Sequence, residues 1–423
     1  MSGTRPDQAS LDETWLPRRA LVIGLARSGI AAAGALAQRG VYVVAADSSS
    51  DVDSGRLADL GVELRLGTEE EALLEGMELV VKSPGVPAES PLVAGARSRG
   101  VPIWSEVELG FRLLPVGSRL IGVTGTNGKT TTTELLGAIL RAAGRSVEVA
   151  GNVGRALTDA AETAPEDSWI VCELSSFQLE DVHLLACDVA VLLNLEPDHL
   201  DRHGTFEVYR DAKLRIFERA RTKVVPRGFG VDGIEFSGDD PLPAEPLILG
   251  RHNRENAAAA TAAARAAGVP DEAIAEALRT FPGVPHRLEL VRELHGVRWI
   301  NDSKATNTAA ARRGVAAYDA SVRLILGGSL KGEDFGPFVR ELPANVRSIY
   351  LVGAAGDELA AALDAAGREY VRAGDLPTAV ARAAADAEAG DVVLLSPASA
   401  SYDQFANFEE RGDTFRRLVE ELT

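Results

Sequence analysis

The stretch Ile121-Gly-Val-Thr-Gly-Thr-Asn-Gly-Lys-Thr-Thr-Thr-Thr133 starts with apolar residues, turns through glycines, reaches Lys129 and continues into Glu134-Leu-Leu136. This order predicts a β-strand, a phosphate-binding loop and a helix. Glycines let backbone N–H groups converge on a phosphate, and the helix N-terminus adds partial positive charge. Lys129 is placed to reach terminal phosphates and Thr130 to ligate Mg²⁺. The stretch therefore predicts a nucleoside triphosphate site.

This loop alone leaves two interpretations open. In the strict eight-residue P-loop pattern the first glycine would stand at Val123, and Gly122 lies one place earlier. A glycine turn between a strand and a helix also occurs in α/β proteins that bind no nucleotide. The choice between an ATP or GTP site and a plain turn depends on the rest of the chain.

Composition limits the class of protein. With 423 residues and 46% hydrophobic content, the chain is long enough for two to four domains with proper cores. Its net charge of −18 disfavours nucleic acid or an anionic membrane surface as the main partner. Cys172 and Cys187 suggest buried free thiols in a reducing compartment, without a zinc site. Because residues 1–17 lack a signal-peptide core and no segment is apolar enough to span a membrane, we expect a cytoplasmic protein.

The N-terminal part reads as a βαβ nucleotide-binding unit. A short apolar strand over 20–23 leads into the turn Gly24–Gly29, and a second strand over 41–46 ends at Asp47. An acidic residue at that distance can bind a ribose, but Ala26 replaces the middle glycine of the fingerprint, which disfavours NAD. A third strand runs into Ser83-Pro-Gly-Val-Pro87, which is either a ligand-binding turn at a sheet edge or a plain structural turn.

Further polar motifs follow apolar strands in the middle of the chain. Glu173 ends the run Ile170-Val-Cys172, where a second Mg²⁺ ligand or a water-orienting carboxylate belongs. The strand over 189–193 leads into Asn194–His203, which holds two histidines and three acids within eight residues. This density is unusual, and the alternative interpretation is a solvated loop with a capping Asp. His252-Asn-Arg-Glu-Asn256 starts an alanine-rich helix, with its two asparagines on one face of the first turn for binding or for capping.

Strands alternate with alanine-rich helices along the whole chain. Pro282–Arg287 interrupts this pattern and reads as an interdomain hinge, after which a hairpin-like run over 288–299 leads into Asn301–Asn307. The pattern predicts an α/β protein of three domains with mostly parallel sheets. We expect a Rossmann-like domain at 1–107, a central P-loop ATPase-like domain at 108–283 and a Rossmann-like domain at 284–423.

Taken together, the motifs resemble the ATP-dependent Mur ligases of peptidoglycan synthesis, over nearly the whole chain. Gly125–Thr130, Glu173, His199 and His252-Asn-x-x-Asn256 are shared by the ligase superfamily. The resemblance to the subgroup that adds D-glutamate rests on these further stretches: Glu173–Leu179, Pro285–Arg287, Trp299–Asn307, Leu395–Phe405, Asn407-Phe408 and Arg411-Gly412.

The resemblance implies a set of residues for each substrate. For the UDP-linked substrate they are Gly24, Ser28, Gly29, Asp47, Ser83, Pro84, Gly85, Asn152 and Ser175. For ATP they are Gly125, Thr126, Asn127, Gly128, Lys129, Thr130, Thr131, Asn256, Arg287 and Asp302. For the incoming amino acid they are Lys304, Thr306, Lys331, Ser401 and Phe408. Two Mg²⁺ ions would have the ligands Thr130, Glu173, His199 and Lys213, and catalysis would depend on Lys129, His199, Lys213 and Glu173.

The resemblance also implies that Lys213 is carbamylated. An ammonium group cannot ligate Mg²⁺, whereas a carbamate is an anionic oxygen donor of the type that this ion prefers. Without the modification, a lysine at this position in a helix would be a surface charge.

The reaction that the resemblance implies is amide formation by a monomeric enzyme. The carboxylate of UDP-N-acetylmuramoyl-L-alanine attacks the γ-phosphate of ATP, and the amine of D-glutamate attacks the resulting acyl phosphate. A sister Mur ligase, a folylpolyglutamate synthase and a non-catalytic nucleotide-dependent scaffold are the alternatives. Two departures from the family pattern are the short stretch between Phe217 and Leu249, at the expected edge of the central sheet, and Tyr402, where a smaller or apolar residue is expected.

Overall fold

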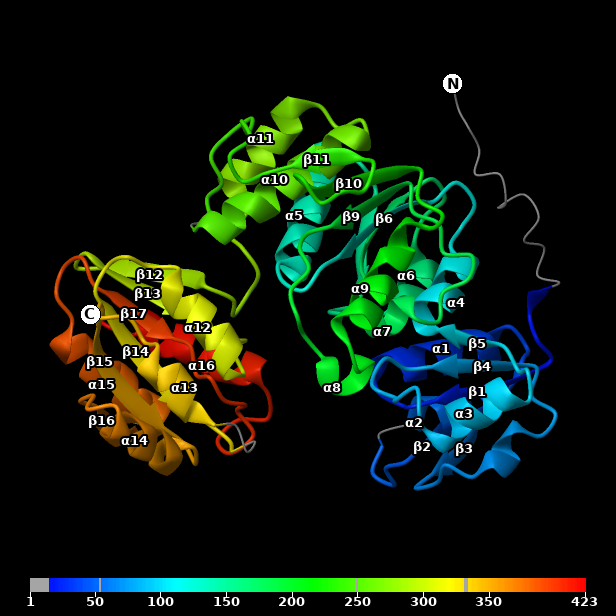
Figure 1. Cartoon of the computed structure of the whole chain (residues 1–423), viewed down its shortest axis with the longest axis horizontal. Coiled ribbons are helices and arrows are strands. Elements are labelled where there is room, and N and C mark those ends of the chain that lie inside the picture. Colours follow the sequence, from blue (N-terminus) through cyan, green and yellow to red (C-terminus); the bar gives the residue numbers. More distant parts are fainter. Residues whose placement is uncertain (1–14, 53–54, 249, 331–333) are drawn as a thin grey trace. The chain divides into compact units, whose positions relative to one another are not determined.

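A computed structural model describes residues 15–52, 55–248, 250–330 and 334–423 (Figure 1). The chain divides into two compact units. The first contains residues up to Pro246 together with His252–Phe281, and the second contains Leu247–Arg251 and Pro282–Thr423. The first unit holds two sheets and the second holds one.

The first sheet is parallel and has the strand order β3-β2-β1-β4-β5. Its strands are β1 (Arg19–Ile23), β2 (Tyr42–Asp47), β3 (Glu63–Leu66), β4 (Leu79–Lys82) and β5 (Ile103–Ser105). Its helices are α1 (Arg27–Gln38), α2 (Gly55–Asp59) and α3 (Pro91–Ser98). The strand order reverses at β1, so the carboxyl ends of β1, β2 and β4 border a crevice of the kind that holds ligands in open α/β sheets.

The second sheet is also parallel and has the order β11-β10-β9-β6-β8-β7. Its strands are β6 (Arg119–Thr124), β7 (Val147–Gly151), β8 (Trp169–Glu173), β9 (Val189–Leu192), β10 (Thr222–Pro226) and β11 (Ile234–Phe236). The helices of this part are α4 (Glu106–Leu113), α5 (Lys129–Ala142), α6 (Leu157–Thr163), α7 (Ser176–Leu179), α8 (Leu200–His203), α9 (Phe206–Leu214), α10 (Arg251–Ala266) and α11 (Asp271–Thr280). The short stretch after Phe217 therefore still supplies two strands, which complete this edge of the sheet.

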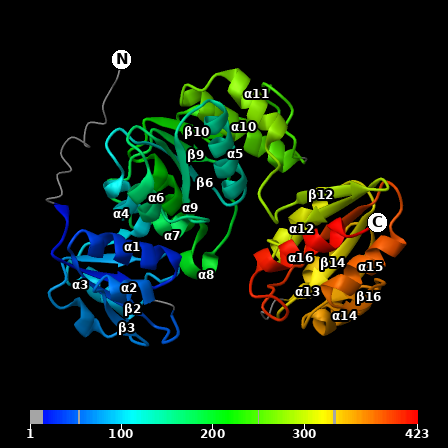
Figure 2. The same cartoon turned by 180° about the vertical axis from the view of Figure 1, so that it is seen from behind.

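The third sheet has the order β12-β13-β17-β14-β15-β16. Its strands are β12 (Glu289–Leu294), β13 (Val297–Asn301), β14 (Val322–Gly327), β15 (Val346–Val352), β16 (Val371–Gly374) and β17 (Val392–Leu395). The predicted hairpin is the antiparallel pair β12–β13, and all other pairs are parallel. Figure 2 shows this unit from behind, with the helices α12 (Thr308–Ala316), α13 (Phe335–Arg340), α14 (Gly356–Ala365), α15 (Leu376–Asp386) and α16 (Phe408–Glu420). One core joins α12, α13 and α14 to the sheet, and a second core joins α15 and α16.

The predicted fold class is confirmed, with three α/β sheets and mostly parallel strands. The apolar run Ile349–Val352 alone predicts a strand, and β15 begins three residues earlier at Val346, because buried Val346 precedes the polar pair Arg347-Ser348. Tyr402 is 72% exposed and so projects from its loop into solvent. Among the described residues, no helix has both the length and the apolar character that crossing a membrane requires.

A buried carboxyl group links α4 to α6 within the first unit. Glu106 is fully buried, and its Oε1 accepts hydrogen bonds from the backbone N (2.7 Å) and the hydroxyl (2.8 Å) of Thr158 in the first turn of α6. The carboxylate thus satisfies an N–H group that has no partner within its own helix. Burial raises the pKa of Glu106 to about 7, although the hydrogen bonds from Thr158 oppose this shift.

Glu106→Gln should therefore change how stability depends on pH. A raised pKa in the folded state means that the native protein binds more protons than the unfolded chain, so this group's contribution is present below the unfolded pKa and is lost as pH rises through about 7. We compare the free energy of unfolding of the glutamine variant with that of the native protein. The value for the variant minus the value for the native protein should be about 3 kcal/mol larger at pH 8 than at pH 4. Urea unfolding of both proteins across this range measures the effect, and parallel pH curves would contradict it.

Candidate active site

The predicted phosphate-binding loop, a glycine loop over residues 125–128, has the backbone that its sequence predicts. It connects β6 to α5, and Gly125 and Gly128 have positive φ angles of 152° and 83°. A Cβ atom at Gly128 would lie 2.1 Å from Oδ1 of Asn256 in α10. Glycine is therefore required at this position, and the structure places Asn256 directly against the loop.

Lys129 and Thr130 begin α5 at the end of this loop. The Lys129 Nζ donates to the carbonyl oxygens of Gly125 and Thr126, each at 2.9 Å, so its charge lies over the loop itself. Thr130 and Thr131 are both buried in the first turn. The cation and the helix N-terminus thus lie together where a phosphate would be stabilised.

The loop is also fixed by residues after β9 that carried no assigned role. Asn194 accepts from the Asn127 backbone N at 2.8 Å and donates to the Asn127 carbonyl at 3.2 Å. Tyr209 in α9 places its hydroxyl 2.8 Å from Oγ1 of Thr126, and Glu196 accepts from the Asn127 side chain at 3.0 Å. The role of these residues in fixing the loop is hard to recognise from the sequence, because the contacts join segments more than 60 residues apart.

Glu173 lies at the end of β8, the neighbour of β6. Its Oε1 accepts from the Asn152 side chain at 3.1 Å. Its Oε2 is buried and, among the described residues, has no hydrogen-bond partner. A buried carboxylate oxygen without a partner is costly, and a bound cation would satisfy it. Ser175 caps α7, because its hydroxyl accepts from the backbone N of Gln178 at 3.2 Å.

Lys213 is buried, so a surface position for this lysine is wrong. It lies in α9 one turn after Tyr209, and its Nζ donates to the Gly125 carbonyl at 2.9 Å. The same Nζ is 4.9 Å from the centroid of the Tyr209 ring. Burial, together with the nearby positive charge of Lys129, lowers the pKa of Lys213 to about 7.

The two histidines of the Asn194–His203 segment have different surroundings. His199 has a left-handed backbone with φ of 52°, a half-exposed ring and Nε2 3.6 Å from the Asp198 carboxylate. His203 is buried, stacks on Phe177 at a centroid distance of 5.0 Å, and has Nε2 2.9 Å from the Ser176 hydroxyl. Only His199 is accessible as a ligand or as a contact for charged substrate groups.

The predicted metal ligands fit a hard, weakly held cation. Within residues 15–52, 55–248, 250–330 and 334–423, no three His, Cys, Asp or Glu side chains lie close enough together to hold a metal ion by themselves. Three of the predicted ligands lie beside the glycine loop: Thr130, Glu173 and Lys213. Mg²⁺ usually keeps several waters and binds one or two carboxylates together with substrate phosphates, which agrees with this sparse arrangement.

A cavity of about 620 Å³ lies at the carboxyl ends of the first sheet. Seven of the nine residues predicted for the UDP-linked substrate line it: Gly24, Ser28, Asp47, Ser83, Pro84, Gly85 and Asn152. The Asp47 carboxylate accepts from the backbone N of Leu25 (2.6 Å) and of Ser49 (2.8 Å). Gly29 does not line the cavity and has a packing role, because a Cβ there would lie 1.8 Å from the Gly24 carbonyl oxygen.

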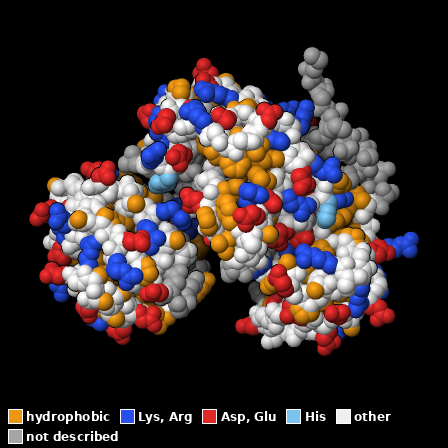
Figure 3. All heavy atoms as spheres, viewed as in Figure 1, with side chains coloured by type: hydrophobic (Ala, Val, Ile, Leu, Met, Phe, Trp, Pro, Cys, Tyr) orange, Lys and Arg blue, Asp and Glu red, His pale blue; other side chains and the backbone are white. Residues whose placement is uncertain are grey.

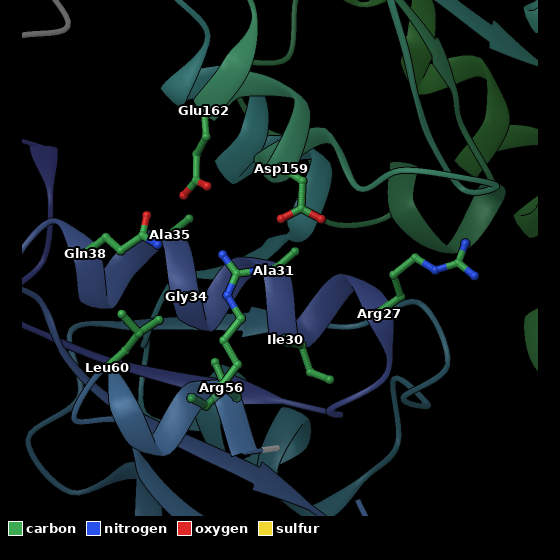
Figure 4. Close-up of a pocket in the computed structure, with 11 residues that line it drawn as sticks. Arg27, Ile30, Ala31, Gly34, Ala35, Gln38, Arg56, Leu60, Asp159 and Glu162 are labelled. Atoms are coloured by element: carbon green, nitrogen blue, oxygen red, sulfur yellow. The ribbon is translucent and has the colours of Figure 1, made fainter. Parts of the chain in front are cut away.

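A second, smaller hollow of about 190 Å³ lies beside α1 and contains none of the predicted residues. Figure 4 shows Asp159 and Glu162 reaching toward α1 from α6, and Arg56 reaching from α2. Gly34 and Ala35 form part of its wall. Its charged side chains are of both signs and come from three helices, α1, α2 and α6, of which α1 and α6 pack against each other.

The second unit gathers its predicted residues at the carboxyl ends of β13 and β17. Asp302 follows β13 and is buried, with Oδ2 accepting from the Ser396 hydroxyl at 2.7 Å, and burial raises its pKa to about 7. The Lys304 Nζ lies 5.7 Å from the centroid of the Phe408 ring. Ser401 is buried in the loop after β17, whereas Lys331 lies outside the described residues.

Three family models match successive parts of the chain. They are the Mur ligase MurD-like N-terminal domain over residues 18–105, the Mur ligase middle domain over 123–228 and the Mur ligase glutamate ligase domain over 286–399. Among curated proteins, UDP-N-acetylmuramoylalanine–D-glutamate ligase from Desulfitobacterium hafniense is 41% identical over 95% of this chain and 97% of its own length. The protein of the same name from Myxococcus xanthus is 40% identical over 96% and 98%.

Solved structures with a similar fold cover most of the chain. UDP-N-acetylmuramate-alanine ligase MurC from Thermotoga maritima matches with a TM-score of 0.57 and 20% identity, over 96% of this chain and 98% of that one. The MurF ligase from Thermotoga maritima in complex with ADP matches with a TM-score of 0.58 and 18% identity, over 90% and 95%. At these identities the likeness concerns the fold.

Proposed function

The chain belongs to the Mur ligase family, and from that premise we propose that it is an ATP-dependent ligase that joins D-glutamate to UDP-N-acetylmuramoyl-L-alanine in peptidoglycan precursor synthesis. The observation that carries the proposal is the convergence of Lys129, Glu173 and Lys213 on one glycine loop at the carboxyl ends of β6 and β8. A nucleotide-dependent scaffold needs the loop but does not need a buried lysine and an unpartnered buried carboxylate beside it.

The reaction divides into phosphoryl transfer and amide formation. The substrate carboxylate attacks the γ-phosphorus of ATP, the bond to the β-phosphate oxygen breaks, and ADP leaves. The D-glutamate amine then attacks the acyl phosphate carbon, and the tetrahedral intermediate expels phosphate while the nitrogen loses a proton. Catalysis needs no covalent enzyme nucleophile and consists mainly of positioning and charge neutralisation.

In this proposal ATP, the UDP-linked substrate and the amino acid are each bound by the set of residues predicted for them. Lys129 moves from the Gly125 and Thr126 carbonyls to the ATP phosphates, and Asn256 bounds the same loop. Arg287 and Asp302 contact the ATP phosphate and ribose. The cavity beside Asp47 and Ser83 takes the UDP end of the substrate. Lys304, Thr306, Lys331, Ser401 and Phe408 bind the amino acid, and each of the three sheets forms the core of one domain.

Mg²⁺ would be held by Thr130, Glu173, His199 and carbamylated Lys213, and would neutralise phosphate charge. The Oε2 of Glu173, which lacks a partner among the described residues, supports this assignment. Carbamate formation needs a neutral amine, and lowering the pKa of Lys213 to about 7 makes the neutral amine far more abundant at pH 7 than in an ordinary lysine. An ordinary lysine would have roughly one neutral amine in three thousand at that pH.

The substrates and the chain's charge indicate where and how the protein acts. We propose a monomer in the cytoplasm, acting on small molecules and not on nucleic acid or membranes. On the face seen in Figure 3, positive and negative side chains are interspersed, which suits a protein whose cationic sites are local.

An amino-acid panel tests the proposed function. Purified protein with ATP, Mg²⁺ and UDP-N-acetylmuramoyl-L-alanine should form amide product and ADP with D-glutamate at least about a hundredfold faster than with L-glutamate, L-alanine or L-lysine. L-alanine and L-lysine leave polar groups of a dicarboxylate site unpaired, and L-glutamate has the opposite configuration at Cα, so its amine and two carboxylates cannot all occupy the positions that D-glutamate fills. Product is measured by mass spectrometry and phosphate release in parallel. Equal rates with L-alanine or L-lysine would indicate a sister ligase, and ATP turnover without any amino-acid dependence would indicate a scaffold or switch.

A further inference from the structure

Arg411 in α16 is buried beneath three loops of the second unit. Its side chain is 1% exposed, and all five of its N–H donors have acceptors. The acceptors are the Ser303 hydroxyl (2.9 Å) and the carbonyl oxygens of Ser303 (2.9 Å), Ser399 (3.0 Å), Ala400 (3.0 Å) and Gly327 (3.4 Å). A planar guanidinium can meet so many acceptors only if their relative positions are fixed.

The three loops follow β13, β14 and β17, which are neighbours in the sheet. Lys304 stands next to one of the acceptor residues and Ser401 next to another. The Ser303 hydroxyl, which accepts from Arg411, in turn donates to the Phe408 carbonyl at 2.8 Å. One guanidinium therefore sets the spacing of the loops that carry the proposed amino-acid pocket.

The charge of Arg411 is not paired within the described part of the chain. None of the described carboxylates lies within ion-pair distance of its guanidinium, and Asp403 acts on it only through space. Burial lowers the pKa of Arg411 to about 10, so the group is still protonated at neutral pH. A buried cation solvated only by carbonyl and hydroxyl dipoles leaves a positive potential around the loops above it.

We propose that Arg411 is a positioning and specificity residue for an anionic amino acid, because it holds the three loops in register and adds positive potential that favours a dicarboxylate over its neutral amide. This inference rests on the proposed function, which places the amino-acid pocket on these loops. Arg411 acts through the loops and need not touch the substrate.

The test compares Arg411→Gln and Arg411→Lys with the control Arg323→Gln. Arg323 lies near the start of β14, at the opposite end of the strand from Gly327, and is paired with Asp391 at 2.6 Å. Arg323→Gln therefore removes an arginine from the same sheet without changing the loops. For each protein, KM is measured for D-glutamate, ATP and the UDP-linked substrate, and the inhibition constant is measured for D-glutamine as a neutral competitor.

Arg411→Gln should raise KM for D-glutamate by about tenfold and weaken D-glutamine binding much less, while the other two KM values stay within about twofold. Arg411→Lys keeps the charge with fewer donors, so it should raise KM for D-glutamate and the inhibition constant of D-glutamine similarly and preserve the discrimination between them. Arg323→Gln should lower the melting temperature and leave KM for D-glutamate unchanged.

An unchanged KM for D-glutamate in Arg411→Gln, or an equal rise in all three KM values, would overturn the inference. If Arg411→Gln does not fold, as judged by circular dichroism, Arg411→Lys decides: an unchanged KM for D-glutamate and an unchanged inhibition constant for D-glutamine in that variant overturn the inference. The amino-acid panel with the wild-type protein distinguishes a failure of the proposed function from a failure of the role of Arg411. Failure of the wild-type protein to ligate D-glutamate refutes the proposed function, whereas ligation by the wild type with Arg411 variants that behave like Arg323→Gln refutes only the role of Arg411.

Discussion

Lys129→Ala is expected to reduce ATP-dependent ligation by about a thousandfold or more and to leave the fold intact. The Lys129 Nζ is the cation of the glycine loop and donates to the loop carbonyls of Gly125 and Thr126. Its loss removes the charge that would neutralise the ATP phosphates, whereas the loop itself stays fixed by hydrogen bonds to Asn194 and Glu196. Phosphate release and product formation are measured with saturating D-glutamate.

Lys223→Ala is a suitable control for this change. Lys223 lies in β10 of the same sheet, with its Nζ 5.6 Å from the Phe217 ring centroid and away from the glycine loop. Its substitution should leave the rate of ligation nearly unchanged. Both variants should show wild-type circular dichroism and cooperative melting. Wild-type turnover by Lys129→Ala would refute the assignment of the ATP site to this loop.

The framework around the glycine loop could be predicted because its signals are local. An apolar run, glycines with positive φ and a helix start follow one another within 13 residues of sequence, and each has a direct physical cause. The same holds for Glu173, since an acid directly after a buried strand must lie at the carboxyl end of the sheet. Six residues of the cavity, namely Gly24, Ser28, Asp47, Ser83, Pro84 and Gly85, lie in or beside the turns after β1, β2 and β4 and follow from the same rule, whereas Asn152 comes from the turn after β7 of the second sheet.

The contacts that fix the loops could not be predicted in the same way. Asn194, Tyr209 and Arg411 reach residues between 11 and 108 positions away, and their neighbours are set by how strands are ordered in the sheets. A weak signal did exist for Lys213. Tyr209, Ala212, Lys213 and Ile216 follow the helical period, so a lysine occupies a position on the apolar face of α9.

Lys213→Ala is expected to lower ligation by at least about a hundredfold, and acetate should partly restore it. The buried Nζ lies beside Gly125 and near the charges of Lys129 and Glu173, at a place where a carbamate can supply an anionic oxygen. Carbamylation adds CO₂ to the neutral amine and releases one proton. A small carboxylate entering the space left by the shortened side chain would supply the missing oxygen, so activity should rise with acetate concentration in this variant and not in the wild type.

Lys213→Arg separates the carbamate from a simple positive charge. Arginine keeps the charge but is not neutral at accessible pH and cannot form the carbamate, so the variant should be inactive and acetate should not rescue it. Because activity alone could reflect misfolding, wild-type protein equilibrated with ¹³C-bicarbonate should show a carbamate carbonyl signal that is missing from Lys213→Ala and is retained in Lys223→Ala. Near wild-type activity in Lys213→Arg, or an unchanged ¹³C signal in Lys213→Ala, would show that no carbamate at this position is needed and would leave Glu173, Thr130 and His199 as the protein ligands to test for Mg²⁺.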